Sequence, residues 1–137
     1  MINPWKRTAS LDEAMLYAGI PFPIIPPGMF PEGIQSVEYF CMDRLIECSG
    51  KGSGGSLAIR KTTRLAEHLS GDYNAYPASY DYELRGTLIH CRGTEDRINT
   101  AELSPLGCQV SVVMNPGRPG SGLTPEDLAG LLQYFIE

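Results

Sequence analysis

The sequence has little positive charge. Its 11 lysines and arginines stand against 16 aspartates and glutamates, which leaves a formal net charge of −5 at neutral pH. A protein with this balance repels nucleic-acid phosphates and anionic lipid headgroups. We therefore expect no nucleic acid among its partners.

A continuous apolar stretch long enough for a membrane helix is also missing. The longest uncharged run, residues 14–31, is interrupted by Pro21, Pro23, Pro26, Pro27 and Pro31. Each proline removes or blocks a helical hydrogen bond, so no membrane helix forms here. No secretory leader with a small-residue cleavage site is visible. The sequence as written predicts a cytoplasmic protein, or an extracytoplasmic one if a longer precursor carries an anchor.

Cysteine and histidine are too scattered for a recognisable metal or redox motif. The cysteines, none of them in a Cys-x-x-Cys arrangement, are Cys41, Cys48, Cys91 and Cys108, and the two histidines are His68 and His90. We therefore predict no metal site and no cofactor. The apolar surroundings of the cysteines favour buried free thiols, while one disulfide and one reactive thiol stay open as alternatives.

The composition is otherwise that of an ordinary globular domain. Of the 137 residues, 42% are hydrophobic, and 15 glycines and 11 prolines are spread over turns and loops. A chain of this length buries enough surface to fold without a disulfide or metal. We expect a single domain over residues 1–137.

Local patterns predict helices near both ends and strands between them. Ser10 precedes a capped apolar stripe over residues 11–18, which Gly19 ends. Thr124 and Pro125 begin a closing helix whose apolar face carries residues 128, 131, 132 and 135. Period-two alternation lies near residues 37–41, 45–49, 57–61, 80–91, 97–103 and 108–114. The expected fold is α+β, with one curved antiparallel sheet of about six strands and an amphipathic helix at each end.

No motif in the sequence carries catalysis. Residues 50–55 spell G-x-G-x-x-G, but a strand rather than a helix follows, so the pattern indicates a flexible connection and not a nucleotide site. His90 and Cys91 are neighbours on a strand and therefore point to opposite faces. We predict no catalytic residues.

Tyrosines and acidic residues gather in one stretch, residues 71–82, which is the candidate contact surface. Aromatic rings there offer faces for a ligand, and carboxylates orient its polar groups. The candidate ligand- or partner-binding residues are Asp72, Tyr73, Asn74, Tyr76, Tyr80 and Tyr82. A structural role for the tyrosines, spanning core and solvent at a sheet edge, is the alternative.

Several short motifs are spread along nearly the whole chain. They include Asn-Pro-Trp at 3–5, Ser-Leu-Asp-Glu-Ala at 10–14, Ile-Arg-Lys at 59–61 and Leu-Arg-Gly at 84–86. Further matches are Ala-Gly at 18–19 leading to Phe22, the hairpin around Asp43, and Leu-Thr-Pro-Glu-Asp-Leu at 123–128, and the most specific match is Ser-Gly-Asp-Tyr-Asn at 70–74. Together these motifs resemble a bacterial domain family of unknown function. Members of that family often form the extracytoplasmic C-terminal part of membrane proteins related to anti-sigma factors, and they also occur as small free-standing proteins. The resemblance implies a compact α+β domain and offers no catalytic residues.

The sequence therefore favours a non-enzymatic binding or regulatory module whose partner is a protein or a small ligand. Two other classes stay open. One is a small-molecule hydrolase with a thiol nucleophile such as Cys91. The other is a module that self-associates through an exposed sheet edge.

Overall fold

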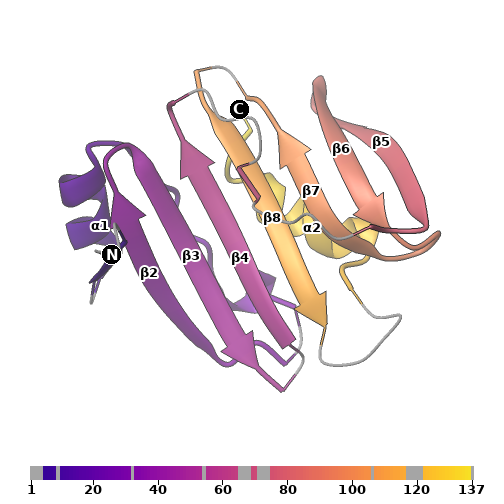
Figure 1. Cartoon of the computed structure of the whole chain (residues 1–137), viewed down its shortest axis with the longest axis horizontal. Coiled ribbons are helices and arrows are strands. Elements are labelled where there is room, and N and C mark those ends of the chain that lie inside the picture. The colour runs from indigo at the N-terminus through magenta and orange to yellow at the C-terminus, as the bar shows by residue number, and fades with distance from the viewer. Residues whose placement is uncertain are drawn as a thin grey trace.

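One antiparallel sheet organises the molecule (Figure 1). This computed structural model describes residues 5–8, 10–31, 33–53, 55–64, 69–70, 75–105, 107–116 and 122–136. The sheet has eight strands in the order β1-β2-β3-β4-β8-β7-β6-β5, and it is not closed into a barrel. The strands are β1 (Lys6–Thr8), β2 (Ser36–Met42), β3 (Leu45–Gly52), β4 (Gly55–Thr62), β5 (Ala78–Leu84), β6 (Thr87–Gly93), β7 (Ile98–Leu103) and β8 (Gln109–Pro116).

The expected α+β layout with one antiparallel sheet and two helices is confirmed, but the expected number of about six strands is wrong. The additional β1 pairs with the end of β2 and is too short to show periodicity. The stretch 80–91 is two strands, because the chain turns back at Arg85 and Gly86, with φ angles of 51° and 84°. Consecutive residues with positive φ suit the right-handed twist of a two-residue hairpin.

Both helices begin where their caps predict, and α1 also ends at its predicted glycine, whereas α2 ends at Leu132 and does not include residue 135. Helix α1 (Leu11–Ala18) starts after Ser10, whose hydroxyl accepts the Glu13 N–H at 3.2 Å, and ends at Gly19 with φ of 75°. Helix α2 (Pro125–Leu132) starts with a capping box between Thr124 and Asp127. Caps are local interactions, so they fix helix boundaries without tertiary information. A short 3₁₀ helix, η1 (Pro27–Met29), lies between α1 and the sheet strands. None of the described helices is long and apolar enough to cross a membrane.

The two faces of the sheet differ in what covers them. Helix α1 packs near β1, β2 and β3, and α2 lies behind β7 and β8 on the same face (Figure 1). Alternate side chains of the strands point to this helix-covered face and form the core with the helices. The largest fully buried core side chains include Ile46, Leu57, Ile59, Ile89, Val110, Val112, Leu131 and Leu132. We call the opposite face the open face.

A partly buried arginine on the open face contacts three residues from other parts of the chain. Arg60 on β4 donates from Nε to the Glu47 carboxylate at 2.7 Å and from Nη1 to the Leu69 carbonyl at 3.0 Å. Its guanidinium also lies over the Trp5 ring, 5.2 Å from the centroid. The planar guanidinium thus contacts a carboxylate, a carbonyl and an aromatic ring at the same time, an arrangement that the ammonium of a lysine fits less well.

Candidate functional site

The strand β5 forms one edge of the sheet and has a single neighbouring strand, β6, in the part of the chain that the structure describes. The two-residue turn makes Leu84 and Thr87 the closing pair of the hairpin. Because opposed residues alternate between hydrogen-bonded and non-hydrogen-bonded pairs, Asp81 and Glu83 direct their backbone N–H and C=O groups away from β6. We call this outward side of β5 the β5 edge.

The open-face side of the β5 edge is acidic. Asp81 Oδ1 lies 2.8 Å from His90 Nδ1 on β6, and both side chains are about half exposed. Glu83 makes no ion pair or hydrogen bond with the described residues. Carboxylates on the edge strand thus project from the face opposite the helices.

Further ionic and polar side chains continue from this pair across the sheet. Arg92 on β6 pairs with Glu102 on β7 at 3.6 Å. Directly opposed positions form one row, namely Asp81, His90, Glu102, Ser111, Arg60 and Glu47. The Ser111 hydroxyl is fully buried in this row and has no hydrogen-bond partner among the described residues. A buried hydroxyl without a partner costs free energy and cannot reach a substrate in solution.

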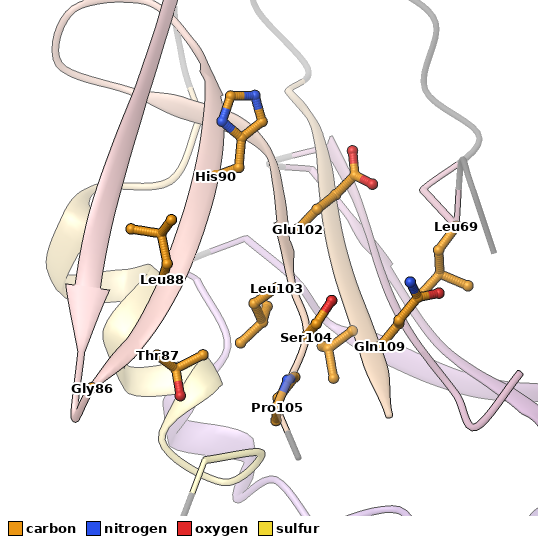
Figure 2. Close-up of a pocket in the computed structure, with 11 residues that line it drawn as sticks. Leu69, Gly86, Thr87, Leu88, His90, Glu102, Leu103, Ser104, Pro105 and Gln109 are labelled. Atoms are coloured by element: carbon orange, nitrogen blue, oxygen red, sulfur yellow. The ribbon is translucent and has the colours of Figure 1, made fainter. Parts of the chain in front are cut away.

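A groove of about 460 Å³ opens on the open face beside β6. Its lining includes Leu69, Leu88, His90, Glu102, Ser104 and Gln109. Figure 2 shows His90 and Glu102 pointing in the same direction from neighbouring strands, with Leu69 on the far side of the groove. The groove mixes polar and apolar groups.

The helix-covered side of β5 carries two tyrosines. Tyr80 donates its hydroxyl to the carbonyls of Thr94 and Arg97, at 3.3 and 3.4 Å. Burial raises the pKa of Tyr80, with smaller contributions from neighbouring groups. Its ring meets the Tyr82 ring edge to face, with centroids 5.4 Å apart. Tyr80 is thus anchored by its contacts, whereas Tyr82 remains 38% exposed and available for a partner.

Next to Tyr82 lies a small apolar cavity, which we call the apolar slot. It has a volume of about 270 Å³ and lies between the β5–β6 hairpin and the first turn of α2. Its lining residues are Tyr82, Glu83, Leu84, Ile89, Pro125, Glu126, Leu128 and Ala129. Pockets for whole small molecules are usually about 300–1,000 Å³. The apolar slot therefore suits one large side chain better than a complete ligand.

The structure describes three of the six predicted contact residues, and it does not place these three on one face of the sheet. Asp72, Tyr73 and Asn74 lie outside the described residues. Tyr76 lies against the Arg92 guanidinium, 5.7 Å from the ring centroid, and Arg92 pairs on the open face. Tyr80 and Tyr82 project from the helix-covered face instead. The tyrosines that the structure describes are thus divided between the two sides of the sheet.

Sequence reasoning missed the Asp81–His90 pair and the apolar slot. The signal for the pair was present in Arg85-Gly86, since a two-residue turn there sets Asp81 opposite His90. The apolar slot had no such signal, because α2 follows β6 by many residues and approaches it only in the folded chain.

The four cysteines are free thiols, and three of them are buried. Burial raises the pKa of Cys91 to about 12, with a smaller contribution from Asp81, and it raises the pKa of Cys48 to about 12 as well. Nucleophilic thiols have lowered pKa values and some exposure. Among the described residues, no group of three or more His, Cys, Asp or Glu side chains is placed to hold a metal ion.

Comparison of the chain with protein-family models, with curated proteins and with solved structures gives no match. The functional inference therefore rests on the geometry of the β5 edge, the apolar slot and the acidic open-face side.

Proposed function

We propose that this protein is a non-catalytic binding module that takes an extended segment of a partner protein as an additional strand along the β5 edge. The single observation that carries the proposal is the seven-residue strand β5, which has β6 on one side and no described strand on the other. Strand addition of this kind uses the partner's backbone for affinity and alternate side chains for specificity.

The β5 edge lacks most of the devices that prevent strands from pairing with other chains. Edge strands are usually very short, or contain proline or a bulge. At the other edge of the sheet, β1 has three residues. By contrast, β5 contains no proline and pairs with β6 in unbroken register from Ala78 to Leu84. Its charged side chains, Asp81 and Glu83, leave the backbone accessible to a partner of suitable charge.

The apolar slot gives such a segment a place to anchor. Side chains of an added strand alternate between the two faces of the sheet. Those on the helix-covered face pass Tyr82 and the apolar slot, where Leu84, Pro125 and Leu128 offer apolar contact. Large apolar or aromatic side chains in small pockets contribute most of the binding energy in many interfaces.

Catalysis by a thiol is the weaker alternative. Cys91 is fully buried, and the same burial that raises its pKa keeps substrates away from its Sγ atom. Self-association through a sheet edge would use the same backbone groups as the proposed binding. It is measured as an increase of the molecular mass of the protein in solution. Small ligands in the open-face groove are a further candidate class of partner.

We also propose membership in the bacterial family that the sequence resembles, on the strength of the motifs at 70–74 and 123–128. A cytoplasmic location, or an extracytoplasmic one in a longer anchored precursor, is part of the same proposal. A binding module without catalytic residues suits either compartment.

Peptide selection tests the proposed function. Displayed random peptides of about ten residues, the length of a long strand, are panned against the protein, and selected peptides are titrated. Two variants at position 83 distinguish the contribution of the backbone N–H to binding from that of the side chain. Glu83→Pro removes an outward N–H at a place where an edge strand tolerates proline, and Glu83→Ala keeps that donor.

We expect selected peptides to bind about tenfold or more weakly to Glu83→Pro than to Glu83→Ala, since at least one backbone hydrogen bond is lost. Circular dichroism checks that both variants keep the sheet. Equal affinity for the two variants, or no selected peptide at all, contradicts strand addition at β5.

A further inference from the structure

We infer that the segment taken up by the β5 edge is basic, with lysine or arginine at alternate positions and a large apolar residue between them. This inference rests on the proposed function and adds the chemistry of the partner. It follows from where the carboxylates and the apolar slot lie along one strand.

Acidic side chains flank the outward backbone groups. Asp81 and Glu83 project to the open face from two of the β5 positions whose N–H and C=O groups point outward. Glu126, at the start of α2, lines the apolar slot together with Glu83. Neither Glu83 nor Glu126 makes an ion pair or hydrogen bond with the described residues. Their charges are thus available to a cationic partner.

The register of an added strand places particular side chains against these groups. Directly opposed residues of antiparallel strands project to the same face, with Cβ atoms about 4.5–5.5 Å apart. Residues opposite Asp81 and Glu83 therefore meet carboxylates on the open face. The residue between them, opposite Tyr82, projects to the other face beside the apolar slot. The complementary pattern is basic, apolar, basic.

Nearby cations do not cancel this preference. His90 is the described partner of Asp81, and it faces the carboxylate from β6 rather than from the β5 edge. Arg85 lies in the turn beyond the end of β5. Neither of these cations forms an ion pair with Glu83.

The same charges disfavour a second copy of this chain as the occupant. Symmetric antiparallel pairing centred on Asp81 sets Asp81 against its own copy. Pairing centred on Tyr82 sets Asp81 against Glu83 of the other copy. Directly opposed like charges destabilise a sheet, and each copy also carries a net charge of −5.

Three labelled peptides of about ten residues, a strand length, test the inference by fluorescence polarisation. They alternate leucine with lysine, with serine or with glutamate, and are otherwise identical. We expect the lysine peptide to bind best and the glutamate peptide worst. The difference shrinks as salt is raised, because ions screen exposed charges.

Charge-reversed variants locate the effect. Glu83→Lys is expected to weaken binding of the lysine peptide by about fivefold or more, which is the upper range for one exposed charge pair. Asp12→Lys changes the charge equally on the exposed side of α1, and its affinity is expected to stay within about twofold of the parent, as for a distant screened charge. Binding lost equally in both variants indicates non-specific attraction and overturns the inference.

The outcomes distinguish the inference from the function on which it rests. Equal binding of all three peptides, with Glu83→Pro still weakening it relative to Glu83→Ala, overturns the basic partner and leaves strand addition standing. No binding of any peptide overturns both. Preference for the lysine peptide that disappears in Glu83→Lys but not in Asp12→Lys supports both.

Discussion

Gly52 on β3 lies against the backbone of Gly33, so closely that a Cβ atom added to Gly52 would stand 1.7 Å from the Gly33 carbonyl oxygen. The contact is fixed by the neighbouring Gln35 N–H, which donates to the Lys51 carbonyl at 2.9 Å. The glycine-rich residues 50–55, interpreted from sequence as a flexible connection, therefore include strand residues over which the preceding chain passes closely.

Replacing Gly52 by alanine is expected to destabilise the fold by about 3 kcal/mol or more, because backbone must move to make room. Gly130 in α2 is the matched control, since its added Cβ would meet only the Met29 sulfur at 3.8 Å. Gly130→Ala should stabilise by about 0.5–1 kcal/mol through helix propensity. Urea unfolding measures both, and a Gly52→Ala variant as stable as the parent contradicts the close approach.

The partnerless hydroxyl of Ser111 makes a second prediction. Ser111→Ala removes a buried polar group that has no described partner, so the free energy of unfolding should stay equal or rise by up to about 1 kcal/mol. Thr62 is the contrasting case, because its buried hydroxyl donates to the Arg44 carbonyl at 2.7 Å and accepts the Arg64 N–H. Thr62→Val should cost about 1–2 kcal/mol. Thermal unfolding compares the pair, and a large loss in Ser111→Ala would show that its hydroxyl is bonded.

Alkaline pH should weaken the fold through its buried thiols. Burial raises the pKa of Cys48 from 9.0 to about 12, and the Glu47 carboxylate adds to the shift. Above pH 9.0 the unfolded chain loses a proton that the folded chain keeps. The free energy of unfolding then falls as pH rises toward the folded value, by at most about 1.4 kcal/mol per pH unit for each such thiol.

Urea unfolding on both sides of pH 9.0 checks this slope. The variant Cys48→Ala is less stable at every pH because it leaves a cavity, but its stability should decline less steeply above pH 9.0. A slope identical to that of the parent would show that Cys48 does not titrate differently in the two states.

Local signals predicted the helices well and the sheet only in part. The caps at Ser10 and Thr124 are contacts within a few residues, and both helices begin after them. Arginine seldom adopts positive φ, so the sequence gives no clear signal for a turn at Arg85. The alternation over residues 80–91 therefore predicts one strand where the structure has two. Strand β1 was missed because three residues are too few for an alternating pattern.

The candidate site was harder to predict, because its parts meet only through strand order. Period-two alternation places Tyr80 and Tyr82 on one face and Asp81 and Glu83 on the other. Sequence alone does not show that β5 lies at an edge, because this depends on β4 pairing with β8 rather than with β5. It also gives no sign that α2 lies beside Tyr82.

The strand order has a consequence for how the chain folds. The eight strands form two runs, β1 to β4 and β8 to β5, in which most pairings link segments close in sequence, as Met42 with Leu45. Among the described strands, the two runs meet where β4 pairs with β8, as in Leu57 with Met114. Closing this distant contact costs more chain entropy than forming any hairpin. The pairing of β4 with β8 should therefore form late in folding, after the strands within each run have paired with one another.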